Sequence, residues 1–91
     1  MATLDVIMPV LNEARTINQS LQSIAAQTHP PDSIWVADGG SHDGTREILD
    51  EWTNRLPIRV LKNPKKRQAP GLNRLIQASD ADYLARMNGH F

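Results

Sequence analysis

The alternation of strand, turn and helix is clearest in residues 34–45, which read IWVADGGSHDGT. An apolar segment, residues 34–37, ends in a carboxylate at Asp38. The glycines that follow suit a backbone that turns sharply or approaches a ligand closely. Apolar residues then recur at helical spacing until Pro57, which ends that helix. The stretch therefore predicts a strand, a glycine-rich turn and a helix in direct succession.

Similar units lie on both sides of this stretch. Apolar, β-branched segments also occupy residues 4–8, 58–61 and 83–87, so strand starts recur about every 25 to 30 residues. Each gap holds an apolar stripe at helical spacing, made of Ile17, Leu21, Ile24 and Ala25, then Ile48, Leu49 and Trp52, then Leu72, Leu75 and Ile76. Pro70 fits the first position of the third helix. The pattern is typical of right-handed βαβ units. We predict one α/β domain over residues 1–91, three layers (α/β/α) with a small parallel Rossmann-like sheet of four strands, βαβαβαβ.

The bulk composition excludes several classes of protein. A chain of 91 residues suits one small core and leaves no room for a second domain. It has no cysteine, so disulfides and thiolate metal sites are excluded, and we expect a reducing, cytoplasmic location. The longest apolar run, residues 6–11, is broken by Pro9 and is far shorter than the ~20 residues of a membrane span. We expect no membrane helix and no signal peptide.

The charges are polarised along the chain although the net charge is zero. Residues 1–54 carry two basic and eight acidic side chains, whereas residues 55–91 carry eight basic and two acidic ones. The cations between Arg55 and Ser79 have no acidic side chain among them, which favours attraction of a phosphate group. Taken alone, such a run is more often a solvated surface, and we favour that interpretation from the charges by themselves.

The first loop at the predicted carboxyl edge of the sheet is residues 9–13, PVLNE. Pro9 fixes a turn there, and a helix that begins after it presents free backbone N–H groups to a base or a phosphate. The plainer interpretation, which this segment alone favours, is that Asn12 caps the helix and Glu13 complements its dipole.

The second loop, residues 38–45, is the most specific stretch of the chain. Asp38 is a carboxylate at the end of a strand, and we expect it to accept a hydrogen bond from a ligand donor such as a base N–H. For Asp43 and Thr45 we favour a role in capping the second helix. The chain has neither G-x-G-x-x-G after its first strand nor G-x-x-x-x-G-K-[ST], so two large nucleotide-binding classes are excluded.

Two motifs together, VIMPVLNE at 6–13 and VADGGSHDGT at 36–45, resemble the opening of family-two glycosyltransferases of the GT-A fold. The resemblance continues through residues 63–64, 67–73 and 82–87 and covers nearly the whole chain. Residues 86–90 are most similar to the succinoglycan-type, exopolysaccharide branch, whose usual form is arginine, an apolar residue, aspartate, a small residue and histidine.

This resemblance implies a nucleotide-binding site for a UDP- or GDP-sugar. The run of cations then gains a reason, since the diphosphate brings about two negative charges. Nucleic acid is a weaker alternative, because no aromatic residue lies among these cations to stack a base. The implied contacts are Pro9, Val10, Leu11 and Glu13 beside the nucleoside, Asp38 with Gly39 at the base, and Arg67 near the diphosphate, with Asn73 holding the loops together.

The resemblance also implies a metal ion, Mg²⁺ or Mn²⁺, held by a D-x-D or D-x-H motif after the fourth strand. Here the chain reads Asn88-Gly89-His90. Hard divalent cations prefer carboxylates to a neutral amide, and one histidine supplies a single nitrogen. Asn88 and His90 therefore form either a weakened metal site or a simple turn followed by a solvated histidine.

By the same resemblance, the chain is the donor-binding half of a glycosyltransferase that acts on a polysaccharide or glycan. The catalytic base of the family lies in the acceptor half, so we assign no catalytic residue and expect no transfer by this piece. A non-catalytic nucleotide-binding or assembly module on the same scaffold is the alternative. In a fold that stops at the fourth strand the sheet edge is open, and we expect a homodimer or larger assembly through residues 83–87 or the apolar surface beside them.

Overall fold

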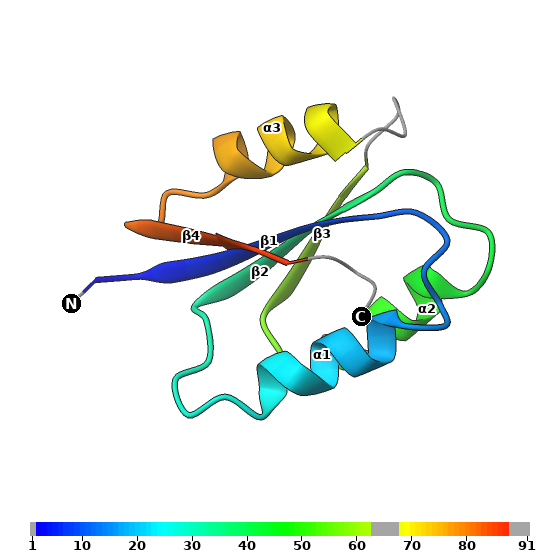
Figure 1. The fold of residues 1–91 in the computed structure, drawn as a ribbon, viewed down its shortest axis with the longest axis horizontal. Helices are drawn as coiled ribbons and strands as arrows, with labels where there is room; N and C mark the ends of the chain where they lie inside the picture. Colours follow the sequence, from blue (N-terminus) through cyan, green and yellow to red (C-terminus); the bar gives the residue numbers. More distant parts are fainter. Residues whose placement is uncertain (1, 63–67, 88–91) are drawn as a thin grey trace.

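The computed structural model describes residues 2–62 and 68–87 (Figure 1). Strands and helices alternate strictly through these ranges, and no helix in them is both long and apolar enough to cross a membrane. The elements are β1 (Leu4–Val10), α1 (Ile17–Ala25), β2 (Ser33–Asp38), α2 (Thr45–Trp52), β3 (Ile58–Lys62), α3 (Gln68–Ala78) and β4 (Tyr83–Arg86). The predicted βαβαβαβ order is confirmed.

The strands form one parallel sheet in the order β3-β2-β1-β4. In the register, Val6 of β1 lies opposite Ile34 of β2 and Ala85 of β4, and Val36 of β2 lies opposite Val60 of β3. Helices α1 and α2 cover one face of the sheet and α3 covers the other (Figure 1). The α/β class and the three-layer, Rossmann-like arrangement are therefore confirmed.

The core lies on both faces because successive side chains of a strand point to opposite sides. Val6 and Met8 face α1 and α2. Ile7, which lies between them, faces the other side and packs with Ala37 and with Leu75 of α3. The larger cluster, on the α1 and α2 side, consists of Val6, Met8, Val10, Ile34 and Val36 from the strands with Ile17, Leu21, Ile24, Leu49, Trp52 and Leu56. Burial on both faces explains why these strands read as continuous apolar runs rather than alternating ones.

Pro9 and Pro70 lie at positions that differ from those predicted from the sequence, a turn for Pro9 and the first helical position for Pro70. Pro9 lies within β1, opposite Ala37 of β2. The pairing of β1 with β4 ends at Ile7, two residues before Pro9, which has no N–H to continue the ladder. Pro70 is the third residue of α3 rather than the first. It still lies in the first turn, whose N–H groups have no acceptor within the helix, so the helix tolerates it.

One buried carboxylate ties three elements together on the α3 side of the sheet. Asp5 of β1 is buried, and its Oδ2 accepts a hydrogen bond from Trp35 Nε1 of β2 at 2.9 Å and from Ser79 Oγ, just after α3, at 2.5 Å. A buried carboxylate is tolerated when donors surround it. Asp5 therefore fixes the end of α3 against the sheet and is a structural residue.

Candidate functional site

The loops after β1 and β2 lie together at the carboxyl edge of the sheet, where parallel α/β sheets bind ligands. The Gly39 N–H donates to the Val10 carbonyl at 3.0 Å, which extends the contact between the strands by one hydrogen bond. Gly40 and Gly44 have φ of 94° and 97°, values that favour glycine. Beyond that bond, side chains of one loop bind the backbone of the other.

Asn12 and Ser41 form the first part of this link. The Asn12 N–H donates to Ser41 Oγ at 2.9 Å, and the Asn12 side-chain oxygen accepts the His42 N–H at 2.8 Å. Asn12 has φ 52°, a left-handed conformation that asparagine adopts more readily than most residues. The side chain of Asn12 thus bridges two loops.

The expectation that Asn12 caps α1 and Glu13 lies in its first turn is wrong. Helix α1 begins at Ile17, its N-cap is Thr16, and its first turn holds no acidic residue. The backbone turns once before the helix, because the Thr16 and Ile17 N–H groups both donate to the Glu13 carbonyl, at 3.1 and 2.8 Å. This extra turn frees residues 12–14 to face the second loop.

Asp43 and Thr45 form the second part of the link. The Glu13 N–H donates to Thr45 Oγ1 at 2.8 Å, and the Ala14 N–H donates to Asp43 Oδ2 at 3.0 Å. Asp43 Oδ1 accepts the Thr45 N–H at 3.1 Å, so Asp43 also satisfies the start of α2 from the position before its N-cap, Gly44. The N-cap of α2 is Gly44, without a side-chain cap hydrogen bond, and Thr45 is the first residue of the helix, so the expectation that Asp43 and Thr45 cap α2 is wrong. We call the four hydrogen bonds between the loops the loop clasp; they join Asn12 to Ser41, His42 to Asn12, Glu13 to Thr45 and Ala14 to Asp43.

The loop clasp has a defined pH dependence through Asp43. The Thr45 hydroxyl, and after it the Ala14 N–H, donate to this carboxylate and hold its pKa below the ordinary 3.8. A carboxylate with a depressed pKa adds stability that is present above the unfolded pKa and is lost as the pH falls through the folded one. We expect the Asp43 carboxyl carbon to titrate with a midpoint below 3.8 in an NMR experiment. In Thr45→Val the midpoint should rise; a wild-type midpoint at or above 3.8 would contradict the geometry.

Asp38 lies where the sequence predicted, at the carboxyl end of β2. Its side chain is 9% exposed, and it lies opposite Val10 of β1 and Lys62 of β3 in the register. Asp38 Oδ1 accepts three hydrogen bonds from its own loop, from Gly40 N at 3.2 Å, Ser41 N at 3.0 Å and Ser41 Oγ at 2.7 Å. Within residues 2–62 and 68–87, no donor reaches Oδ2. That oxygen is therefore the one able to accept a hydrogen bond from a ligand.

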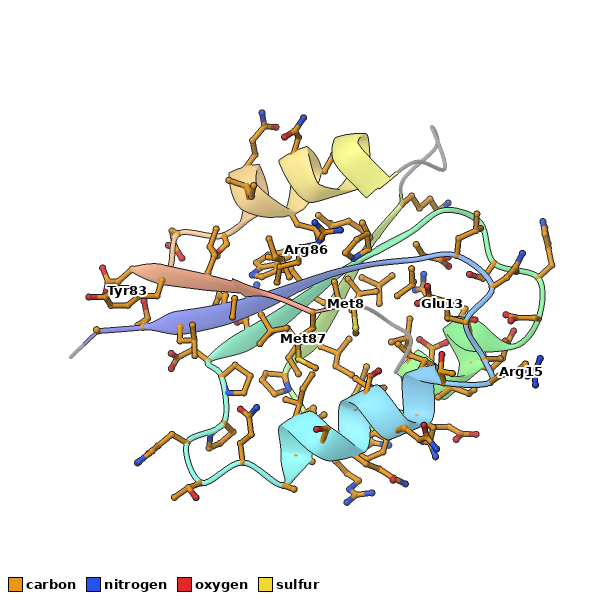
Figure 2. The ribbon with its side chains drawn as sticks, in the orientation of Figure 1. Met8, Glu13, Arg15, Tyr83, Arg86 and Met87 are labelled. Carbon is orange, nitrogen blue, oxygen red and sulfur yellow. The ribbon has the colours of Figure 1, made fainter. Side chains whose placement is uncertain are left out.

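The other predicted site residues divide between the loops and the core. Val10 is buried in the core cluster, so its backbone carbonyl is the part that contacts the second loop. Leu11 opens the first loop and is 39% exposed. Glu13 is half-buried and lies between the loop and the sheet ends, whereas Arg15 extends outward (Figure 2). Gly39 and Pro9 are buried, Asn73 is exposed on α3, and Arg67, Asn88 and His90 lie outside the described residues.

Ser41 and Asn12 are the residues whose role sequence reasoning missed. Ser41 follows Asp38 by three residues, a spacing typical of an aspartate that accepts bonds from its own loop, and this signal was available. The hydrogen bonds that join Asn12 to Ser41 and His42 cannot be predicted from the neighbouring sequence. They depend on β1 and β2 being neighbours in the sheet.

The described residues do not provide a metal site. Within them, no three or more histidine, aspartate or glutamate side chains are grouped closely enough to hold an ion. The sequence candidates, Asn88 and His90, fall in the part that is not described. The donor set that is described does not fit Mg²⁺ or Mn²⁺, which need several oxygen ligands.

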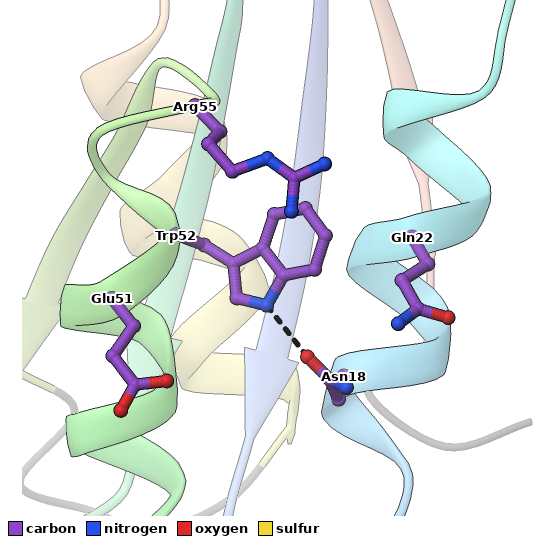
Figure 3. Close-up of a pocket in the computed structure, with 5 residues that line it drawn as sticks. All are labelled: Asn18, Gln22, Glu51, Trp52 and Arg55. Carbon is purple, nitrogen blue, oxygen red and sulfur yellow. Dashed lines mark hydrogen bonds between the residues drawn. The ribbon is translucent and has the colours of Figure 1, made fainter.

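A cleft of about 360 Å³ lies elsewhere, between α1 and α2 (Figure 3). Trp52 Nε1 donates to Asn18 Oδ1 at 2.7 Å, and the Arg55 guanidinium carbon lies 4.5 Å from the indole centroid. The hydrogen bond joins α2 to α1 and satisfies the single polar group of the indole, its N–H. No residue of the loop clasp lines this cleft, and we assign it a packing role.

Curated relatives have similar sequences. Succinoglycan biosynthesis protein ExoA of Rhizobium meliloti is 35% identical over 89 residues, which cover 93% of this chain and 27% of the relative. Glycosyltransferase AglE of Haloferax volcanii is 33% identical over 89 residues, covering 92% of this chain and 29% of the relative. The chain thus spans less than a third of the length of these relatives.

Solved structures share the architecture, and the sequence matches a family model. The mannosyltransferase PcManGT from Pyrobaculum calidifontis, in complex with GDP-Man and Mn²⁺, superposes with a TM-score of 0.86 at 24% identity, over 97% of this chain and 27% of that one. S. aureus TarS 1–349 in complex with UDP-GlcNAc gives a TM-score of 0.85 at 23% identity, over 96% and 26%. Both show the fold. Residues 5–91 match the family described as Glycosyl transferase family 2. The chain therefore belongs to glycosyl transferase family 2, as its two motifs indicated, and carries part of the GT-A fold.

Proposed function

We propose that this chain binds the nucleoside diphosphate sugar that a glycosyltransferase uses as donor, with Asp38 accepting a hydrogen bond from the base. The proposal rests on the environment of Asp38, which is 9% exposed at the carboxyl edge of the sheet. Among the described residues, the hydrogen bonds that its own loop donates all go to Oδ1 and none goes to Oδ2. A carboxylate oxygen accepts up to two hydrogen bonds, so Oδ2 is able to receive one from a ligand donor. A base N–H at the strand ends is such a donor.

The donor class follows from what Asp38 can accept. Uracil N3–H and guanine N1–H are ring donors able to meet a carboxylate, which favours UDP- and GDP-sugars. The structures of similar fold include complexes with UDP-GlcNAc and with GDP-Man. Pro9, Leu11 and Glu13 then flank the nucleoside, and Gly39 lets the backbone approach it. The placement of the diphosphate near Arg67 stays a prediction.

Calorimetric titration tests this proposal with UDP and GDP and with their N3-methyl and N1-methyl counterparts, which lack the ring N–H. We expect one parent diphosphate to bind and its methylated form to bind about tenfold more weakly or worse, because Asp38 loses its donor. We call this ratio the methylation penalty. Equal affinity for the two forms contradicts the role of Asp38, and absence of binding to both parents contradicts the proposed function.

We also propose that these 91 residues bind the donor without transferring the sugar. In the transfer, an acceptor hydroxyl oxygen bonds to the anomeric carbon as the bond to the diphosphate breaks, and the hydroxyl proton passes to a carboxylate base. The chain corresponds to 27% of the ExoA length, and residues 88–90 read Asn-Gly-His. We expect no product above background with a panel of UDP- and GDP-sugars and glycan acceptors. Turnover by this chain alone would overturn the expectation.

The sequence at residues 88–90 favours one alternative, a nucleotide-binding module that has lost catalysis together with its metal carboxylate. Mn²⁺ separates the two functions. A higher affinity for UDP or GDP in the presence of Mn²⁺ supports the donor-binding part of an enzyme. An affinity that is the same with and without Mn²⁺ supports the nucleotide-binding module.

Self-association through β4 is a further prediction about this chain. In the described sheet β4 pairs with β1 alone, and Tyr83 and Leu84 on it are 64% and 39% exposed. Open strand edges are templates for pairing with a second chain. Light scattering at high concentration should give the mass of a dimer or a larger assembly. A monomer at every concentration would contradict the prediction.

A further inference from the structure

The Ser41 hydroxyl is held between two fixed partners. Its Oγ accepts the Asn12 N–H at 2.9 Å and donates to Asp38 Oδ1 at 2.7 Å. A hydroxyl has a single hydrogen to donate. An ionised carboxylate only accepts, so that hydrogen is directed at Asp38, while a lone pair of Oγ accepts the Asn12 N–H of the first loop.

This bond helps to orient the Asp38 carboxylate. Oδ1 receives the Ser41 hydroxyl together with the Gly40 and Ser41 backbone N–H groups. Hydrogen bonds to a charged acceptor are short and strong, and several on one oxygen restrict rotation of the carboxylate. The Ser41 hydroxyl, at 2.7 Å, is the shortest of the three and the one that a side-chain substitution removes.

The same hydroxyl makes the orientation of Asp38 depend on the first loop. Asn12 presents its N–H to Ser41 from a left-handed conformation, φ 52°, and its side chain returns to the His42 N–H at 2.8 Å. Asn12 is therefore held by two hydrogen bonds, one through its backbone N–H and one through its side chain. The Ser41 hydroxyl oxygen links the Asn12 backbone to the Asp38 carboxylate.

We infer that Ser41 is a positioning residue that sets base selectivity, by holding Asp38 so that Oδ2 meets the ring N–H of the base. This inference rests on the proposed function. Without the hydroxyl, Asp38 remains charged but keeps only the two backbone hydrogen bonds to Oδ1, so its carboxylate turns more readily. The chain then loses affinity for UDP or GDP and also loses part of its preference for a base with a ring N–H.

The test compares Ser41→Ala with wild type in the four titrations, UDP and GDP with their methylated forms. We expect the affinity for the preferred parent to fall about tenfold and the methylation penalty to shrink from about tenfold to about twofold. Ser41→Thr keeps the hydroxyl and should restore both values. Thr53→Ala removes an exposed hydroxyl just after α2, one that bonds the Asp50 carbonyl and belongs to neither site loop, and should leave both unchanged.

A general loss of loop structure would weaken the parent and methylated diphosphates equally, so a Ser41→Ala protein with an unchanged methylation penalty overturns the inference while the proposed function stands. Wild type that binds neither UDP nor GDP overturns both. If Ser41→Ala fails to fold, Ser41→Cys replaces it, since a thiol of similar size is a weak donor and should also shrink the penalty. An undiminished penalty in Ser41→Cys counts against the inference.

Discussion

Asp38→Asn is expected to weaken the binding of UDP or GDP about thirtyfold, the largest effect on binding of any single substitution proposed for this chain. A hydrogen bond to a charged acceptor contributes about 1.5 to 3 kcal/mol, and about 2 kcal/mol corresponds to this factor. The amide oxygen of asparagine still accepts the bonds from Gly40 and Ser41 that Asp38 Oδ1 accepts now. Its amide nitrogen then faces the base N–H, donor against donor. Calorimetric titration measures the change.

Asp80→Ala is the matched control, because it removes an exposed carboxylate from the loop between α3 and β4, remote in sequence from both site loops. The control should bind as wild type does, which separates a local contact from the loss of one negative charge. Wild-type affinity in Asp38→Asn would show that the base does not contact this side chain.

The second large effect is on stability. Leu49 of α2 is 0% exposed in the main core cluster, and Leu49→Ala is expected to lower the free energy of unfolding by about 3 kcal/mol, through lost apolar burial and the cavity left behind. A domain of this size has about 5 to 14 kcal/mol in total. The loss is therefore a large fraction of the stability. Urea denaturation followed by tryptophan fluorescence measures it.

Leu84→Ala is the matched control for that measurement. The same atoms are removed, but Leu84 is 39% exposed on the edge strand β4, and we expect a loss below about 1 kcal/mol. Equal losses in the two variants would contradict the placement of the core between α2 and the sheet.

Most of the fold was predictable because the spacing of apolar residues differs between helices and strands. The stripes that include Leu21, Leu49 and Leu75 mark the buried faces of three helices, and these three residues are fully buried. The expectation that Ile76 also faces inward is wrong, since it is 48% exposed. The strand spacing predicted parallel crossovers. Sheet order and register were not predicted from the sequence, although the edge strands β3 and β4 carry charged residues, Arg59, Lys62 and Arg86, that the central β1 and β2 lack at the same density. The position of β1 between β2 and β4 comes from packing.

The site was predictable in part, for a physical reason. Asp38 follows a strand directly, so its place at the carboxyl edge is a consequence of a parallel sheet. Asn12 was misread because a local rule, in which asparagine caps the next helix, competes with partners that are distant in sequence. Its bonds to Ser41 and His42 span 29 and 30 residues and exist because β1 and β2 are adjacent. Local patterns contain no information on such pairs.

The central claim is that the loops after β1 and β2 form one nucleoside site with Asp38 turned toward the base. Amide NMR spectra of the chain, recorded during titration with UDP and with GDP, test it most directly. We predict the largest shifts at Glu13, Asp38, Gly39 and Ser41, with the Trp52 indole and Tyr83 unchanged. Largest shifts at Asn18, Gln22 and Trp52 in the cleft between α1 and α2, with residues 38–41 unmoved, would contradict it.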